Sequence, residues 1–216
     1  MKTLSNPIIP AIIAKNQKEL NKRISKVKKH VSRIQLDIMD KKFVKNSSLE
    51  FDFKLPKFKG KYEAHIMVKN PEEWINKNSG MINTIIFHLE AEKNPGKIIK
   101  LLKSKRKKIG IGIKPETSLD KIKPFLSQID MVLIMAVHPG RYGAKFLPSM
   151  LKKIEKLRKL SPKLNIEVDG GITDKTISKT FVAGANMFVS GSYLQKSKDI
   201  KSSINLFKSL LIYKVK

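Results

Sequence analysis

The residues best suited to chemistry in this chain stand where short apolar runs end. Asp169 ends a β-branched run and is followed directly by Gly170 and Gly171. Glycines tolerate positive φ and let backbone N–H groups approach an anion closely. A second apolar run ends at Gly191 and Ser192. Two such loops in succession near the C-terminus predict a phosphate site next to a carboxylate, rather than two isolated tight turns.

Further polar residues fall inside apolar runs upstream. Gln35 and Asp37 lie two positions apart, so both point to the same face of a strand, and His65 and His88 lie in the next two runs. Two aspartates, an imidazole and an amide in one pocket could hold a divalent metal through nitrogen and oxygen. Burying Asp37 and Asp169 without a cation or a shared proton would be very costly. For His88 alone, a buried and hydrogen-bonded side chain is the favoured interpretation.

Three methionines follow or end strands close to these acids, namely Met39, Met67 and Met135. A single methionine is usually core filling. Three around one acid pair would instead form an apolar wall that excludes water and sustains shifted carboxylate pKa values.

The elements that must position these residues alternate along the whole chain, which is typical of repeated βαβ units. Eight strands are predicted: 7–13, 33–38, 62–67, 84–88, 108–113, 131–137, 165–168 and 186–189. Helices are predicted at 17–31, 71–78, 95–104, 118–126, 146–160, 174–183 and 199–211, with a short helical turn near 47–51. No linker divides residues 1–216, so one domain is expected, and the longest non-periodic connection, 41–60, is a candidate functional loop.

Composition limits the class of protein. The 216 residues are 41% hydrophobic and contain no cysteine, which excludes disulfides and thiolate metal sites. Prolines interrupt the N-terminal ten residues, and no apolar run approaches the ~20 residues of a membrane span, so we expect a cytoplasmic protein without a membrane partner.

The formal net charge of +27 comes mostly from lysine, since arginine occurs only at 23, 33, 106, 141 and 158. The lysines are spread over every predicted helix without aromatic interleaving. We therefore interpret them as a solvated surface that attracts anionic small molecules, and expect no nucleic-acid partner.

An ordered set of motifs resembles the ribulose-phosphate 3-epimerase family from about residue 7 to residue 211. The motifs are Asp37-Ile-Met-Asp-x-x-Phe-Val-x-Asn46, Ala64-His-Ile-Met67, His88-x-Glu-Ala91, Met135-Ala-Val-x-Pro-Gly140, Lys145-Phe-x-Pro148, Glu167-Val-Asp-Gly-Gly-Ile172 and Ser190-Gly-Ser192. The resemblance implies an α/β fold, a single-domain (β/α)₈ TIM barrel of the ribulose-phosphate-binding type. It also implies an isomerase of carbohydrate metabolism that inverts C3 of a ketose phosphate, converting D-ribulose 5-phosphate to D-xylulose 5-phosphate.

The resemblance further implies roles for particular residues. Asp37 and Asp169 fall on the acid/base positions, where one removes the C3 proton to give an enediolate and the other reprotonates the opposite face. Both also fall on metal-ligand positions, together with His65 and, less securely, Gln35. The metal, which could be Zn, Fe, Mn or Co, would polarise the substrate oxygens. Phosphate contacts are expected from Gly143, Gly170, Gly171, Gly191 and Ser192, and the three methionines match a sulfur-rich pocket wall. We also expect a homo-oligomer; the metal, the oligomeric state and the choice between pentulose and hexulose phosphate stay open.

Several positions depart from the family pattern. Gln35 stands where the family usually has a metal-binding histidine, and an amide oxygen is the weaker ligand. Ala11 and Ala14 replace serines, and Tyr142 replaces a glycine of the loop after the sixth predicted strand, where Arg141 could partly compensate by charge. These departures keep a second hypothesis open, a weakly active or inactive barrel that binds a sugar phosphate.

Overall fold

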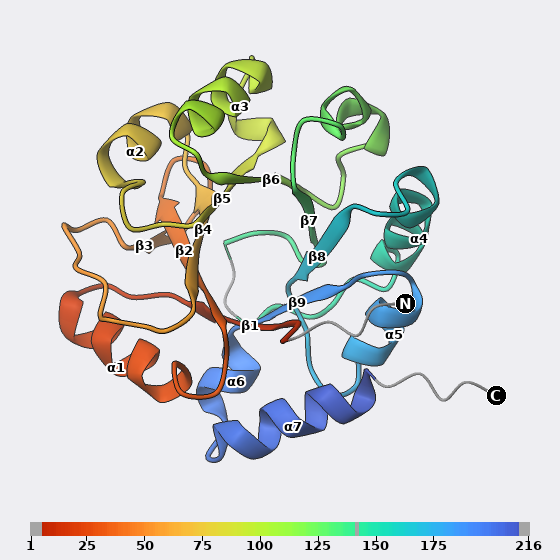
Figure 1. The fold of residues 1–216 in the computed structure, drawn as a ribbon. Helices are drawn as coiled ribbons and strands as arrows, with labels where there is room; N and C mark the ends of the chain where they lie inside the picture. Colours follow the sequence, from red (N-terminus) through yellow and green to blue (C-terminus); the bar gives the residue numbers. More distant parts are fainter. Residues whose placement is uncertain (1–5, 141–142, 212–216) are drawn as a thin grey trace.

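A parallel β-sheet closes on itself to form a barrel, with the helices outside it (Figure 1). The computed structural model describes residues 6–140 and 143–211. Hydrogen bonding runs in the order β1-β9-β8-β7-β6-β5-β4-β2, and β1 also pairs with β2, which closes the ring. All eight of these strands are parallel to their neighbours, and a ninth, β3, pairs antiparallel with β2 at the edge of the ring. The (β/α)₈ fold predicted from the sequence is confirmed.

The strands lie close to their predicted positions. Their bounds are β1 Ile8–Ile12, β2 Arg33–Asp40, β3 Ser47–Ser48, β4 Lys61–Met67, β5 Thr84–His88, β6 Lys108–Ile113, β7 Met131–Met135, β8 Asn165–Asp169 and β9 Met187–Ser190. The prediction of a helical turn at 47–51 is wrong. Leu49 has φ +56°, outside the helical region, and Ser47 and Ser48 pair with Asp40 and Met39 instead.

The helices surround the barrel between successive strands. Their bounds are α1 Gln17–Val27, α2 Pro71–Asn78, α3 Pro95–Ser104, α4 Met150–Leu160, α5 Ile177–Val182, α6 Ser192–Lys196 and α7 Ile200–Leu210, with 3₁₀ turns η1 Leu89–Ala91, η2 Leu119–Lys121 and η3 Lys123–Phe125. Within the described residues, none of these helices has the length and apolar character needed to cross a lipid bilayer.

Helix α1 ends at Val27 instead of residue 31, and α5 begins at Ile177 instead of residue 174. Two further helix predictions need correction, both near prolines. The segment 118–126 forms two 3₁₀ turns, because Pro124 has no backbone N–H with which to continue an α-helix. The helix predicted from Phe146 begins at Met150, because Pro148 disfavours the α conformation of the residue before it. Helix α6 was not predicted as a separate element; with five residues it is too short to show a helical period.

Side chains alternate between two cores along each strand. The outward-facing residues pack under the helices, for example against Leu20, Ile24 and Val27 of α1. The inward-facing apolar residues of β1, β5, β7 and β9 form a second, smaller core inside the barrel. On β2, β4 and β8 the inward positions are largely polar, and these strands carry the candidate site.

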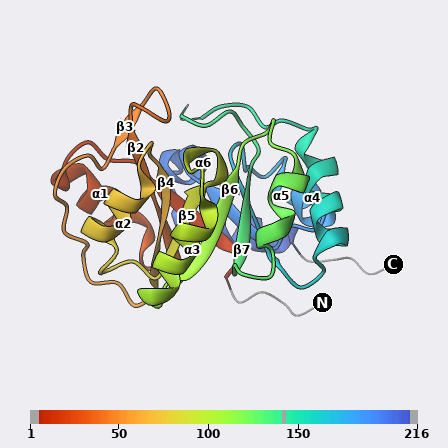
Figure 2. The same cartoon turned by 90° about the horizontal axis from the view of Figure 1, so that it is seen from above.

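The connection between β2 and β4 has no helix between Leu49 and Gly60, whereas each of the other connections between barrel strands contains an α-helix or 3₁₀ turns. Instead its side chains alternate: Phe51, Phe53 and Leu55 pack against the core, and the residues between them are exposed. An extended segment therefore covers the surface that a helix would cover. In the side view, the turn that carries β3 and the loop after β7 stand at the same end of the barrel (Figure 2).

If this segment takes the place of a helix, its inward residues should stabilise the fold. Leu55 is 8% exposed, so Leu55→Ala should lower the free energy of unfolding by about 2–5 kcal/mol. The matched change Lys57→Ala removes an exposed side chain of the same segment and should change it by less than about 0.5 kcal/mol. Urea denaturation of both variants measures the difference; equal stabilities would show that the segment does not pack as a structural element.

Candidate active site

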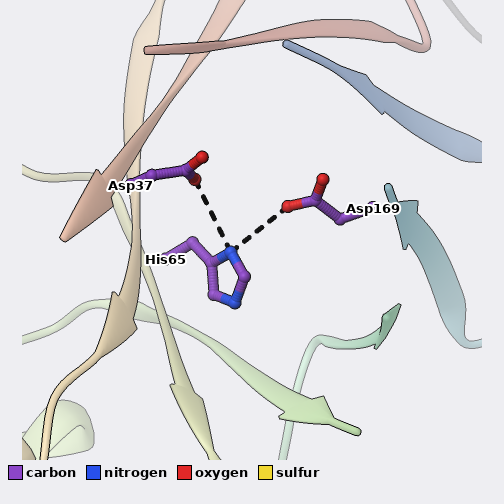
Figure 3. Close-up of side chains that lie close together, drawn as sticks. All are labelled: Asp37, His65 and Asp169. Atoms are coloured by element: carbon purple, nitrogen blue, oxygen red, sulfur yellow. Dashed lines mark ion pairs between the residues drawn. The ribbon is translucent and has the colours of Figure 1, made fainter. Parts of the chain in front are cut away.

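Three strands deliver the central side chains of the site. Asp37 and His65 are register partners on the adjacent strands β2 and β4, and Asp169 ends β8 on the other side of the barrel. His65 is fully buried, and Asp37 is 8% exposed. Figure 3 shows the two carboxylates pointing toward each other with the imidazole between them. The convergence predicted from the sequence, at the C-terminal ends of parallel strands, is therefore present.

His65 and Gln35 hold the two carboxylates together. The His65 Nδ1 atom lies 3.2 Å from Asp169 Oδ2 and 3.6 Å from Asp37 Oδ1. The Gln35 Nε2 atom donates to Asp37 Oδ1 and to Asp169 Oδ2, both at 2.8 Å. One amide nitrogen carries two hydrogens, so it can serve both acceptors at once. Each carboxylate thus shares the same imidazole and the same amide.

The pKa values of His65 and Asp37 are both raised, but for different physical reasons. Burial alone would lower the pKa of His65, but hydrogen bonds to Asp169 and Asp37 and their negative charges raise it to about 9. Burial raises the pKa of Asp37 in spite of its hydrogen bonds from His65 and Gln35, and the charge of Asp169 adds to that rise. The imidazolium of His65 therefore supplies the positive charge that the buried Asp37 and the partly buried Asp169 require.

The same residues fit a divalent cation. Asp37, His65 and Asp169 each offer one ligand atom, and these atoms all lie within 4.8 Å of one another. Carboxylate and imidazole form a donor set typical of first-row transition metals. The Gln35 Oε1 atom is buried without a hydrogen-bond partner, and half a turn of the amide would exchange it with the nitrogen that faces the carboxylates. The predicted fourth ligand is thus in reach of the site, although its nitrogen faces the acids here.

Behind His65 lies a second buried histidine. The Nε2 atoms of His65 and His88 are 2.8 Å apart, and His88 Nδ1 lies 3.1 Å from Glu90 Oε2. Burial lowers the pKa of His88 to about 4. Burial alone would raise the pKa of Glu90, yet hydrogen bonds from His88 and Thr117 and the charge of His88 lower it to about 2. The interpretation of His88 as a buried, hydrogen-bonded residue is confirmed.

Deeper in the barrel lie two glutamates that the sequence analysis did not single out. Glu63 and Glu167 are fully buried, and Glu63 pairs with Arg33 at 2.9 Å. Burial raises the pKa of both carboxyl groups, and for Glu167 the nearby charge of Glu63 adds to the rise. The sequence pattern could have predicted them, because each lies two residues before a site residue, Glu63 before His65 and Glu167 before Asp169, and so faces the barrel interior.

A cavity of about 150 Å³ opens above the carboxylates. This volume is below the ~300–1,000 Å³ of pockets for drug-sized ligands, so the cavity suits a small metabolite. The lining includes most residues that the sequence predicted for the site, namely Asp37, Asp169, Met39, Met67, Met135, Gly143, Gly170, Gly171, Gly191 and Ser192. Gln35 and His65 do not line it, because they lie beneath the two carboxylates.

Two adjacent glycines line the cavity beside Asp169. Gly170 and Gly171 have φ of +107° and +65°. A Cβ atom on Gly171 would lie 2.6 Å from the backbone nitrogen of Phe146, and one on Gly170 would lie 2.4 Å from a methyl group of Val137. Both positions therefore require glycine on conformational and on steric grounds.

Of the departing positions, Ala11 lines the cavity, whereas Ala14 is buried outside it. The replacement at Tyr142, with its neighbour Arg141, lies outside the described residues.

The fold and the site together define a (β/α)₈ barrel with an acid pair and glycine loops at the C-terminal ends of its strands. Solved barrels of this shape include a 3-hexulose-6-phosphate synthase (TM-score 0.68, 14% identity, 95% of this chain and 100% of that one). Another is orotidine 5'-monophosphate decarboxylase from Sulfolobus solfataricus (TM-score 0.64, 13% identity, 96% and 98%). At these identities the likeness concerns the fold alone.

Sequence comparison identifies the family. Residues 7–195 match the Ribulose-phosphate 3 epimerase family. The chain is 35% identical to the ribulose-phosphate 3-epimerase of Schizosaccharomyces pombe over 193 residues, covering 86% of this chain and 85% of that protein. It is 32% identical to the ribulose-phosphate 3-epimerase of Helicobacter pylori, covering 91% and 94%. The chain belongs to the ribulose-phosphate 3-epimerase family, a family of carbohydrate epimerases.

The requirement for glycine at position 171 can be measured. Gly171→Ala forces a non-glycine residue to φ +65° against the Phe146 backbone, so it should cost at least ~1–3 kcal/mol of stability. Gly80→Ala is the matched control, because a Cβ atom there meets nothing within 4 Å, and it should change stability by less than about 0.5 kcal/mol. Thermal and urea unfolding compare the two, and a fully stable Gly171→Ala protein would contradict the loop geometry.

Proposed function

We propose that this protein inverts C3 of D-ribulose 5-phosphate to give D-xylulose 5-phosphate. The observation that carries the proposal is the placement of Asp37 and Asp169 on opposite sides of one small cavity, both in contact with His65. Inversion needs a proton removed from one face of a carbon and another delivered to the opposite face. Two carboxyl groups facing each other across a pocket can perform these two transfers without either of them moving far.

The surroundings of the two acids support this chemistry. Burial raises the pKa of Asp37, which makes its carboxylate a stronger base than one in water. Met39, Met67 and Met135 line the cavity beside the acids, and their apolar side chains exclude water from the reacting carbon. One aspartate would take the C3 proton, leaving an enediolate, and the other, already protonated, would return a proton from the opposite side.

Asp37, His65 and Asp169 would hold a divalent metal ion, and Gln35 would add a fourth ligand through its oxygen once the amide turns. The chemistry that such an ion supplies when bound is polarisation of the substrate's oxygen atoms, which makes the C3 hydrogen more acidic. The residues of this chain then hold the two carboxyl groups within reach of one carbon. The identity of the metal stays a prediction limited to Zn, Fe, Mn or Co.

We place the substrate's phosphate against Gly143, Gly170, Gly171, Gly191 and Ser192. All five line the same cavity as the acid pair. The four glycines let backbone N–H groups approach phosphate oxygens, and Ser192 adds a hydroxyl donor. Binding there would fix C3 between Asp37 and Asp169, so that binding energy remote from C3 contributes to the rate.

A second candidate function is binding of a sugar phosphate in the same pocket without turnover. Gln35 donates hydrogen bonds to both acids, and Ala11 lines the cavity where the family usually has serine. These features favour a weakly active or inactive barrel that binds a sugar phosphate. Calorimetry that detects binding of ribulose 5-phosphate without any epimerisation would support this candidate.

We also propose a cytoplasmic location, supported by the 35% identical rice relative named as a cytoplasmic isoform of ribulose-phosphate 3-epimerase. A homo-oligomeric state and the absence of a nucleic-acid partner stay predictions from the sequence.

The acid pair makes a direct test possible. Incubation with ribulose 5-phosphate in deuterium oxide should place deuterium at C3, and Asp37→Asn or Asp169→Asn should slow this exchange by at least ~10²–10⁴-fold, since each removes a proton carrier. Asp52→Asn is the control, because Asp52 is an exposed residue of the connection after β3. Absence of exchange in the metal-supplied wild-type protein, with every pentulose and hexulose phosphate tried, would exclude an epimerase.

Gln35 offers a second test. Gln35→His introduces an imidazole, which first-row metals favour over an amide oxygen, so metal retained after dialysis against a chelator should rise by on the order of tenfold. Turnover should rise with it if metal is limiting. Tight metal binding without a gain in turnover would point to Ala11 or the loop at 141–142 as the limiting departure. Unchanged metal retention would show that position 35 does not reach the metal.

A further inference from the structure

A buried line of hydrogen-bonded side chains runs from His65 away from the pocket. His65 Nε2 lies 2.8 Å from His88 Nε2, and His88 Nδ1 lies 3.1 Å from Glu90 Oε2. The other oxygen of Glu90 accepts from the backbone N–H of Lys114 at 2.9 Å and from the hydroxyl of Thr117. Both imidazoles are fully buried, so water does not complete these contacts. Every hydrogen on this line must therefore be placed between protein atoms.

The contacts select one arrangement of hydrogens. Glu90 accepts from two other donors as a carboxylate, so the His88 nitrogen that faces it must carry a hydrogen. A second hydrogen on His88 would make it a fully buried cation, which is costly. His88 Nε2 therefore keeps its lone pair, and His65 Nε2 must donate to it. The remaining nitrogen of His65, Nδ1, faces Asp37 and Asp169.

Packing holds the His88 ring in this orientation. The ring of Phe43, from the connection after β2, lies with its centroid 5.0 Å from that of His88. On β6, Gly112 is the register partner of His88, and a Cβ atom there would lie 3.3 Å from the imidazole. The absent side chain leaves the ring room on that side. His88 is thus confined between an aromatic ring and a bare stretch of backbone.

We propose that His88 and Glu90 are positioning residues that keep a ring hydrogen of His65 on Nε2, so that it is Nδ1 that releases its hydrogen and offers a lone pair to a cation bound between the two aspartates. Neither residue lines the pocket, so neither touches substrate. Their effect passes through the orientation and tautomer of His65, as partners behind a metal-binding histidine commonly act. The inference rests on the proposed function in one respect, the assignment of His65 as a metal ligand.

Nitrogen NMR tests the hydrogen positions directly. The chain has four histidines, at 30, 65, 88 and 138, so long-range ¹H–¹⁵N correlation spectra are simple to assign with His30→Gln and His138→Gln. Without metal, His88 should be neutral with its hydrogen on Nδ1. After addition of Zn²⁺, His65 should carry its hydrogen on Nε2 with the metal shift on Nδ1. A hydrogen on Nε2 of His88, or zinc on Nε2 of His65, would overturn the proposal.

Zinc affinity, measured by competition with a chromogenic chelator, tests the consequence. Glu90→Gln removes the acceptor charge behind His88 and should weaken zinc binding by about 10–100-fold. Glu116→Gln is the matched control, because Glu116 pairs with His138 at 2.9 Å on an exposed surface, and it should leave zinc binding unchanged. Equal zinc affinity of Glu90→Gln and the wild type would contradict the positioning role.

A second pair of variants distinguishes loss of the positioning contact from a loss of folding in Glu90→Gln. In His88→Gln the amide oxygen can still accept from His65 Nε2, so zinc affinity should stay within a few-fold of wild type. His88→Leu removes the acceptor and should show the full loss. Wild-type zinc affinity in His88→Leu would overturn the proposal. None of these readouts requires turnover, so an inactive protein that passes them would contradict the proposed reaction and leave the positioning role intact.

Discussion

The contact of one buried imidazole with the carboxylates of Asp37 and Asp169 is the interaction on which the rest of this site depends. Asp37 and Asp169 would repel each other in this small cavity, and His65 is the ionisable base that lies close to both of them. Its position follows from barrel closure, because the β1–β2 pairing completes the ring that brings β8 to face β2 and β4. A change that opens the barrel at this seam would separate the charges and remove the reason for burying them.

The polar character of the site continues into the barrel below it. Inward positions on β2, β4 and β8 carry Gln35, Glu63 and Glu167, whereas those on β1, β7 and β9 are apolar. Arg33 compensates Glu63, and burial raises the pKa of Glu167 well above its usual range, so that this carboxyl group holds a proton more tightly than one in water. On one side of the barrel interior, polar groups thus take the place of apolar packing and lie below the acid pair.

The part of this structure that the sequence predicts is the part set by periodicity. A period of two places Gln35 and Asp37 on one face, and parallel strands bring Asp169 to the same pocket, so the acid pair and its glycine loops were foreseeable. The pairing of Gln35 with both acids was not, because the orientation of an amide depends on partners from distant strands. The predictions from periodicity failed where a proline interrupts a helical pattern, as at Pro124. They also failed in the connection before β4, where an extended segment covers the core in place of a helix.

Gln35 shows how one substitution can change the balance of the whole site. Its NH₂ group satisfies Asp37 and Asp169 together, which a single ring nitrogen of histidine could not do. To offer its oxygen to a cation the amide must turn and give up both bonds, each to a charged acceptor and worth about 1.5–3 kcal/mol. The turned nitrogen would need new acceptors, and Glu63 and Glu167 have buried oxygens without partners. Binding of a cation therefore gains less free energy than it would with histidine at position 35, so a higher concentration of free cation is needed to reach the same occupancy.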